Sequence, residues 1–239
     1  MKPYDEIRPK GEQVREMFDR IAPAYDRLND IMSLRVARLW RKKMAKIVAK
    51  LYPKHILDLA TGTGDMAIVL AKRMRGAHIT GADPSEGMLS IAEKKIAKKH
   101  LSERIKLEVA EAEKLPYADG SFDAVTVVFG VRNFHDIGAG LREMHRVLRR
   151  KGMVFIMEFS MPRGKIFAPI YRFYFRKWLP LVGGKVSGDK DAYTYLPESV
   201  VEFPDWEQFT ELMWECGYAN VKSKALFFGI ARIYKGEKR

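Results

Sequence analysis

Residues 55–74 read HILDLATGTGDMAIVLAKRM, a short apolar run followed by a glycine-rich turn and then apolar residues at helical spacing. The run at 55–60 predicts a buried strand, and the spacing at 65–74 predicts a helix. Gly62 and Gly64 lie between them, where the lack of a Cβ atom lets the backbone approach a ligand closely. This stretch therefore predicts the strand, turn and helix with which a nucleotide-binding α/β fold begins.

Strands and helices continue to alternate on the C-terminal side of this unit. Strands are predicted at 77–83, 105–110, 122–130 and 153–160, and helices at 85–100, 138–150 and 205–217. Two closing strands, at 220–226 and 229–236, are separated by too few residues for a parallel crossover, so we expect them to pair antiparallel. The alternation predicts an α/β fold with a seven-stranded, mostly parallel sheet, helices on both faces and an antiparallel last strand.

The length of 239 residues and the 47% hydrophobic content suit one globular domain. Within residues 1–239 we expect a helical N-terminal cap at 1–51 and a ligand-binding core at 52–160. A substrate-side insert or lid at 161–203 and a closing helix with an antiparallel strand pair at 204–239 complete the expected organisation.

The composition says more about where the protein is found than about what it does. A lone cysteine, Cys216, excludes an intramolecular disulfide, and the N-terminus lacks the apolar stretch of a secretory signal, so we expect a cytoplasmic protein. No apolar run reaches the roughly 18 residues of a membrane span. The net charge of +13 suits nucleic acid, an anionic membrane surface or an anionic substrate, and does not choose among them. The five His and one Cys show no metal-ligand spacing, so no metal is expected.

Two acidic residues, Asp83 and Asp58, indicate which kind of nucleotide ligand binds. Asp83 ends the second predicted strand, where it can accept hydrogen bonds from both hydroxyl groups of a ribose. Alternatively, it caps the helix that opens at Pro84 and Ser85. With Ala67, the glycine loop also satisfies a relaxed dinucleotide fingerprint, so an NAD oxidoreductase is a rival. Asp58 favours a methyl donor, because an acid in an apolar strand needs a partner and an amino-acid tail supplies an ammonium group.

Several motifs occur in the order of a known enzyme class. The segments DLATGTGD (58–65), GADPSEGML (81–89) and AEAEKLPYADGSFDAV (110–125) together resemble the class I S-adenosylmethionine-dependent methyltransferases, whose Rossmann-like fold the chain is then expected to adopt. More narrowly, four segments resemble the ubiquinone/menaquinone biosynthesis C-methyltransferases. They are YDRLNDIMSLRVARLW (25–40), FGVRNFHDIGAGLREMHRVLRRKG (129–152), VFIMEFS (154–160) and DKDAYTYLPESVVEFP (189–204).

The resemblance implies that S-adenosyl-L-methionine is the cofactor, with S-adenosyl-L-homocysteine as its product. Thr63 is expected to contact it from the glycine loop, Asp83 at the ribose and Glu111 near the adenine amine. The full set of expected cofactor contacts is Tyr25, Asp58, Ala60, Gly62, Thr63, Gly64, Asp83, Pro84, Met88, Glu111 and Ala112. The chain departs from the family in having Ala37 for His, Glu111 for Asp or Asn, and RRKG at 149–152 for Lys-Pro-Gly-Gly. A longer carboxylate at 111 can still accept from the adenine amine, whereas Ala37 leaves the particular quinol open.

The implied reaction is C-methylation of a lipophilic quinol ring, demethylmenaquinol or a related polyprenyl benzoquinol. A phenol of pKa near 10 loses its proton at neutral pH at a cost of roughly 4 kcal/mol, and one well-aimed buried donor supplies about 2.7 to 4 kcal/mol. Arg132 follows the fourth strand, where open α/β sheets bind ligands, so we expect it to stabilise the phenolate. Asn133 is a candidate positioning group, and His135 and Asp136 are candidate proton acceptors. In the alternative reading, Asn133 and Asp136 cap the next helix and His135 faces solvent. By resemblance, Tyr195 is a further candidate for contact with the quinol oxygen.

The segment 166–182 mixes aromatic residues with Arg172, Arg176 and Lys177. It suits a lid that admits a polyprenyl chain at the inner face of a membrane, and it equally suits a core helix with snorkelling cations. The sequence leaves the oligomeric state open, with a homodimer among the alternatives.

Three rival functions follow from other features. The net charge motivates an RNA methyltransferase of the same fold, but the motif typical of amino-methylating enzymes is replaced by FGVRNF at 129–134, so we do not expect a nucleic acid partner. A class I methyltransferase acting on another small molecule is a second rival. A non-catalytic cofactor-binding partner in quinone synthesis is the third, and predicts cofactor binding without methyl transfer.

Overall fold

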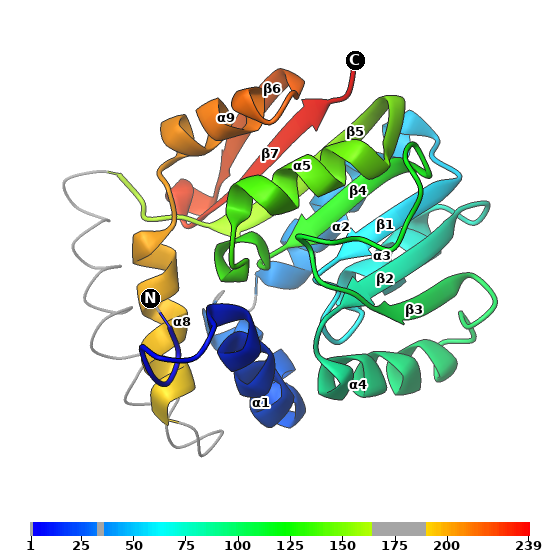
Figure 1. The fold of residues 1–239 in the computed structure, drawn as a ribbon. Coiled ribbons are helices and arrows are strands. Elements are labelled where there is room, and N and C mark those ends of the chain that lie inside the picture. The colour runs from blue at the N-terminus through cyan, green and yellow to red at the C-terminus, as the bar shows by residue number, and fades with distance from the viewer. Residues whose placement is uncertain (1, 33–35, 164–189) are drawn as a thin grey trace.

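The structure, a computed structural model, describes residues 2–32, 36–163 and 190–239 and contains a seven-stranded sheet in the order β3-β2-β1-β4-β5-β7-β6 (Figure 1). Strands β1 to β5 are mutually parallel, and β7 is antiparallel to both β5 and β6. The strands are β1 (His55–Leu59), β2 (His78–Asp83), β3 (Ile105–Val109), β4 (Phe122–Val128), β5 (Leu148–Phe159), β6 (Ala219–Leu226) and β7 (Ala231–Glu237). The predicted α/β fold, with its antiparallel last strand, is therefore confirmed.

Helices cover both faces of this sheet. The helices are α1 (Lys10–Met32), α2 (Ala37–Val48), α3 (Asp65–Arg73), α4 (Glu86–Ala97), α5 (Ile137–Val147), α8 (Lys190–Glu202) and α9 (Trp206–Glu215), with short 3₁₀ turns η1 (Ala49–Leu51), η2 (Val131–Asn133) and η4 (Phe227–Gly229). Apolar residues of α1 to α4 and α8 form one core cluster, and those of α5 and α9 form another on the opposite face. The central strands are buried on both sides, which explains their continuous apolar runs.

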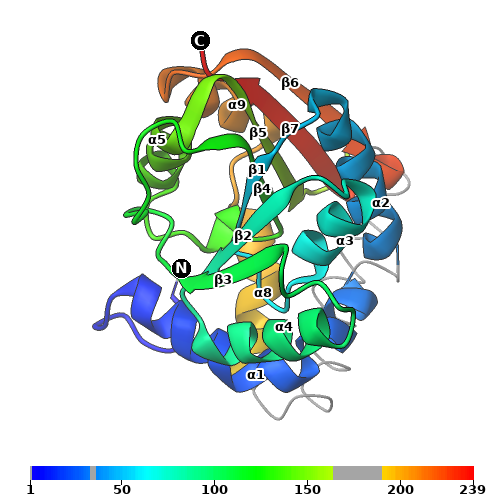
Figure 2. The ribbon, with the colours of Figure 1, turned by 90° about the vertical axis from the view of Figure 1, so that its right-hand side faces the viewer.

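Helix α1 lies outside the regular alternation. It packs beside α4 beneath the sheet edge that carries β3 (Figure 2). Its apolar side chains, which include the buried Val14, Met17 and Ile21, join the core cluster of α2, α3 and α4. The position of α1 brings its first half close to the carboxyl ends of the parallel strands, where the candidate site lies.

The largest boundary error among the predicted elements lies between α5 and β5. The helix expected at 138–150 ends at Val147, and β5 begins at Leu148 rather than at residue 153. Leu148 pairs with Phe122 on β4, and the chain then turns at Lys151, whose φ is +62°. The amide of Lys151 donates to the carbonyl of Lys238 at the far end of the chain. This pairing is non-local, so it overrides a helical pattern that local spacing alone favours.

The segment 166–182, predicted as a lid or a core helix, lies outside the described residues. Among the helices that the structure describes, none combines the length and apolarity needed to cross a bilayer.

Candidate functional site

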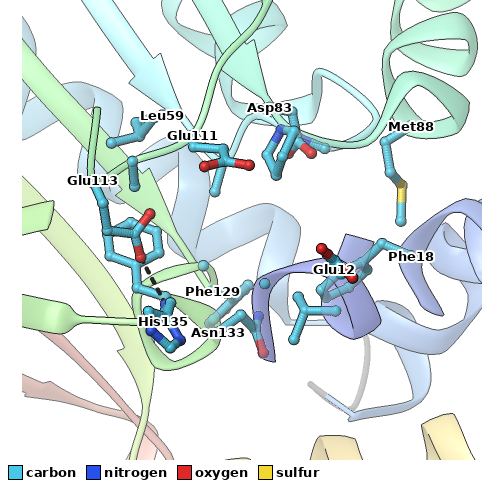
Figure 3. A pocket seen from close by; sticks show the side chains of 18 of the residues that line it. Glu12, Phe18, Leu59, Asp83, Met88, Glu111, Glu113, Phe129, Asn133 and His135 are labelled. Atoms are coloured by element: carbon cyan, nitrogen blue, oxygen red, sulfur yellow. Dashed lines mark hydrogen bonds between the residues drawn. The ribbon is translucent and has the colours of Figure 1, made fainter. Parts of the chain in front are cut away.

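A cavity of about 360 Å³ lies at the carboxyl ends of β1, β2 and β4, between these strand ends and α1 (Figure 3). This volume is in the range of small-molecule sites. The residues that line it come from Pro9 and α1, from the strand ends and loops after β1, β2, β3 and β4, and from the start of α4. They are Pro9, Gly11, Glu12, Val14, Phe18, Tyr25, Leu59, Ala60, Gly62, Asp83, Pro84, Met88, Glu111, Ala112, Glu113, Phe129, Gly130, Asn133, Phe134 and His135.

The loop after β1 forms the floor of the cavity in a left-handed conformation. Ala60, Gly62 and Gly64 have φ values of +51°, +55° and +78°, and Gly64 forms the N-cap of α3. A Cβ atom on Gly130, in the loop after β4, would lie 2.5 Å from the Cβ atom of Ala60. Glycine is therefore required at 130 for the two loops to meet.

Asp83 ties this floor to the end of β2. Its Oδ2 accepts the backbone N–H of Gly62 at 2.8 Å, and its Oδ1 accepts the N–H of Ser85 at 3.0 Å. The N-cap of α4 is Ser85, whose hydroxyl accepts the N–H of Met88, so Asp83 does not cap the helix itself. Burial raises the pKa of Asp83 to about 6. A carboxylate that keeps its charge at neutral pH despite burial is typical of a functional position.

Two of the expected cofactor contacts have protein partners instead of lining the cavity. Asp58 accepts hydrogen bonds at 2.6 Å from the hydroxyls of Thr61 and Thr126, and burial raises its pKa to about 6. Thr63 donates to Asp26 at 2.7 Å, and Lys95 donates to Thr63 at 3.0 Å. Gly64 does not line the cavity either. The other expected contacts line the cavity, namely Tyr25, Ala60, Gly62, Asp83, Pro84, Met88, Glu111 and Ala112.

Helix α1 is joined to the loop after β4 and to α4 at three points. Near its start, the Lys10 ammonium donates to the carbonyls of Arg132 and Phe134 at 3.3 and 3.0 Å. In its middle, Asp19 accepts the N–H of Gly87 at 2.9 Å at the start of α4. Towards its end, Asp26 accepts from Lys95 at 2.9 Å. The first contact reaches the loop after β4 and the other two reach α4, so the helix closes one side of the cavity.

The loop after β4 supplies the other wall. Asn133 is buried and lines the cavity, and the exposed His135 lines it as well. The backbone N–H of His135 donates to Glu113 at 2.7 Å (Figure 3), and the N–H of Asp136 donates to the same carboxylate at 3.2 Å. Asp136 is the N-cap of α5 and accepts the N–H of Ala139 at 2.9 Å. Its carboxylate therefore has a structural partner and does not line the cavity.

The structure gives Arg132 a different environment from the one that we expected. Its side chain is 1% exposed, and Nη1 donates to Glu158 Oε1 at 2.6 Å. Nη1 also donates to the carbonyl of Phe129 at 2.6 Å, and Nε donates to Ser199 at 3.2 Å. Arg132 is absent from the cavity lining. The expected direct contact between Arg132 and a phenolate is therefore not supported by this geometry.

Tyr195 lies behind Asn133 rather than in the cavity. It is 2% exposed, and its hydroxyl donates to Asn133 Oδ1 at 3.3 Å. Burial raises the pKa of Tyr195, so the phenol stays protonated and remains a donor. Because Oδ1 of Asn133 is engaged by Tyr195, its Nδ2 group is left as the donor that can serve a ligand.

Sequence reasoning missed several residues that line the site. Phe18 of α1 was not expected there, and it forms an edge-to-face pair with the expected contact Tyr25, with ring centroids 5.7 Å apart. Phe129 lines the cavity and stacks on Phe159 at 4.1 Å. Glu113 holds the loop after β4, as described above. The sequence signal for Phe18 is its place in the N-terminal helix pattern, whereas nothing local to Glu113 indicates a partner 22 residues away.

The lining is acidic although the chain as a whole is basic. Glu12, Asp83, Glu111 and Glu113 line the cavity, and neither Lys nor Arg is present among its described lining residues. Such a surface favours a cationic ligand. The described residues also contain no group of three or more His, Cys, Asp or Glu side chains placed to hold a metal ion.

Comparisons with known proteins agree with this geometry. Residues 6–238 match the model of the ubiE/COQ5 methyltransferase family. The ubiquinone/menaquinone biosynthesis C-methyltransferase UbiE of Geotalea uraniireducens is 45% identical over 233 residues, covering 97% of this chain and 99% of the relative. The demethylmenaquinone methyltransferase of Deinococcus radiodurans is 45% identical over 237 residues, covering 99% of this chain and 97% of the relative.

Solved structures share the fold at lower identity. A SAM-dependent methyltransferase from Thermotoga maritima superposes with a TM-score of 0.68 at 20% identity, covering 95% of this chain and all of the other. A Haemonchus contortus phosphoethanolamine N-methyltransferase 2 in complex with S-adenosyl-L-methionine has a TM-score of 0.60 at 15% identity, covering 82% of this chain and 52% of that one. Together with the near full-length family match, these findings show that the chain is a methyltransferase and belongs to the ubiE/COQ5 methyltransferase family.

Proposed function

We propose that this protein transfers a methyl group from S-adenosyl-L-methionine to a ring carbon of a lipophilic quinol, most simply demethylmenaquinol. One observation carries the proposal: a single cavity is lined by Asp83, a carboxylate placed to bind a ribose, and by the side chains of Phe129, Asn133 and Phe134. The named activities of the relatives from Geotalea and Deinococcus support the same acceptor class.

The acidic part of the cavity fits the cofactor. The fixed acceptor Asp83 suits the ribose hydroxyls, and Glu111 with Ala112 lies where the adenine would be read, at the end of β3. The four lining carboxylates complement the positive charge of a sulfonium and an ammonium group. The bound cofactor supplies the electrophilic methyl group, and the protein orients the acceptor against it. In this arrangement Asp58 acts indirectly, since its hydrogen bonds to Thr61 and Thr126 fix the floor of the cavity.

Stabilisation of the quinol oxygen falls to Asn133. Its Nδ2 group is a neutral donor on the cavity wall, and the hydroxyl of Tyr195 polarises the amide from behind. A buried donor of this kind contributes about 2.7 to 4 kcal/mol to a developing oxyanion. His135 lines the same end and is exposed, so it serves as the group that accepts the phenol proton and passes it to water.

Transfer of label from methyl-labelled S-adenosyl-L-methionine to reduced demethylmenaquinone with a short prenyl tail tests the proposal. We expect ring-methylated product, and we expect Asn133→Ala to lower kcat by about 100-fold while the affinity for S-adenosyl-L-homocysteine changes less than threefold. His135→Gln should lower kcat, because the amide side chain cannot accept the phenol proton. Tight cofactor binding without methyl transfer to any quinol would refute the proposed acceptor, and salt-dependent methylation of RNA would replace it.

A further inference from the structure

The buried ion pair between Arg132 and Glu158 lies directly behind the wall of the cavity. Glu158, near the end of β5, is 0% exposed, and the side chain of Arg132 on η2 is 1% exposed. Neither residue lines the cavity. A pair of full charges this deeply buried is costly to form, so it is weak evidence for stability in itself.

The carboxylate of Glu158 accepts hydrogen bonds from both the side chain and the backbone of Arg132. Its Oε1 accepts from the guanidinium at 2.6 Å, and its Oε2 accepts from the backbone N–H of Arg132 at 3.3 Å. Oε1 also accepts the N–H of Phe159 at 2.9 Å. Because side chain and backbone of one residue are bound to one carboxylate, the conformation of η2 is fixed relative to β5.

Two further bonds fix η2 relative to α8. Arg132 Nε donates to Ser199 at 3.2 Å, and Tyr195 donates to Asn133 at 3.3 Å. Tyr195 and Ser199 are four residues apart, so they lie on the same face of α8, one turn apart. Adjacent residues of η2 thus contact adjacent turns of α8. The placement of Asn133 against Tyr195 therefore depends on where Arg132 is held.

We infer that Glu158, Arg132 and Ser199 are positioning residues that together hold the Asn133 amide toward the acceptor and Tyr195 behind it. The inference rests on the proposed function, in which Asn133 contacts the quinol oxygen. Arg132 thereby acts through Asn133, not on the substrate itself. An error of about 1 Å in such a group is sufficient to lower a rate by about 100-fold.

The test replaces the pair with apolar residues of similar size, Arg132→Met with Glu158→Leu, alongside each single variant. A single variant leaves one buried charge unpaired and should lower Tm by at least about 6 °C. The double variant removes both charges, so Tm should recover to within about 4 °C of the wild type. We expect its kcat to remain at least about 30-fold reduced, while the affinity for S-adenosyl-L-homocysteine stays within threefold. Neutralisation of the pair Lys106 and Glu108, whose side chains are 76% and 25% exposed, with Gln at both positions is the control, and should change neither Tm nor kcat.

Hydrogen exchange of the same variants gives a readout that needs no acceptor. Amides of 131–134 should exchange faster in the double variant than in the wild type, while α3 and α4 keep their protection. A double variant with wild-type kcat and unchanged exchange at 131–134 would overturn the inference. Failure of the wild type to methylate any quinol would instead refute the proposed function. The hydrogen-exchange result would still decide whether the Arg132–Glu158 pair orders η2. If the double variant does not fold, Ser199→Ala takes its place, with an expected threefold to tenfold fall in kcat at an unchanged Tm.

Discussion

Replacement of Asp83 by Asn removes one negative charge from the cavity and nearly preserves the side-chain shape. In the wild type, burial raises the pKa of Asp83 from 3.8 to about 6. This difference corresponds to about 3 kcal/mol of free energy. Because the folded-state pKa is the higher one, the stabilising contribution of the protonated group is fully present below pH 3.8. It is lost as the pH rises through about 6.

At pH 8 the neutral Asn avoids the free-energy cost of burying a charged carboxylate, but it cannot replace both hydrogen bonds of Asp83. Asp83 accepts from Gly62 and from Ser85, whereas an amide offers only one oxygen. One buried N–H is then unsatisfied, which costs about 1 to 3 kcal/mol. We therefore expect Asp83→Asn to be neutral or stabilising by up to about 2 kcal/mol at pH 8, and destabilising by about 1 to 3 kcal/mol near pH 4.

The same change should weaken cofactor binding at pH 8. Hydrogen bonds to a charged acceptor are worth about 1.5 to 3 kcal/mol, so the affinity for S-adenosyl-L-homocysteine should fall by about 10- to 150-fold. Calorimetric titration at pH 8 and thermal unfolding between pH 4 and pH 8 measure the two effects.

The matched control is Asp123→Asn, at the amino end of the same sheet. Asp123 is buried and accepts the backbone N–H groups of Lys54 and His55 at 2.5 and 3.0 Å. This variant should lose stability without losing cofactor affinity. Wild-type affinity in Asp83→Asn at pH 8 would refute the ribose contact, and a Tm difference that does not vary with pH would refute the raised pKa.

Three further changes test other parts of the site. Gly130→Ala places a Cβ atom 2.5 Å from that of Ala60, so Tm should fall by about 2 to 12 °C and cofactor affinity should fall with it. The control Gly76→Ala, which lies away from the cavity and whose Cβ atom would meet only Lys54 Nζ at 3.7 Å, should change neither. Lys10→Met removes two hydrogen bonds that join α1 to the loop after β4, so hydrogen exchange in the first turns of α1 should accelerate and cofactor affinity should fall severalfold. Unchanged exchange would contradict a closing role for α1. Asp136→Ala removes the N-cap of α5 and should cost about 1 kcal/mol of stability with kcat within twofold, whereas a 100-fold loss of kcat at full cofactor affinity would identify Asp136 as the base.

Local chemistry made much of the fold predictable. The apolar run before Gly62, the glycine loop and the alternation that follows determine a parallel sheet, because strand and helix periodicity are properties of neighbouring residues. The boundary of α5 was missed because Leu148 pairs with Phe122 across the sheet. Gly62, Asp83 and Glu111 line one cavity because they lie at strand ends that a parallel sheet brings to one edge, and their contact with a cofactor stays a prediction.

What the sequence by itself determined is therefore the family, the sheet and the edge at which the candidate site lies, since each depends on short motifs. Only the tertiary structure decided what the polar residues at that edge contact. Arg132 meets Glu158, 26 residues away, and Lys10 reaches the carbonyl of Arg132 across 122 residues. A motif shows that a cation follows β4, but it does not show whether a buried carboxylate already neutralises it. That depends on side chains that approach only when β5, α8 and α1 pack against the same loop, and these contacts make Asn133 rather than Arg132 the group that faces the cavity.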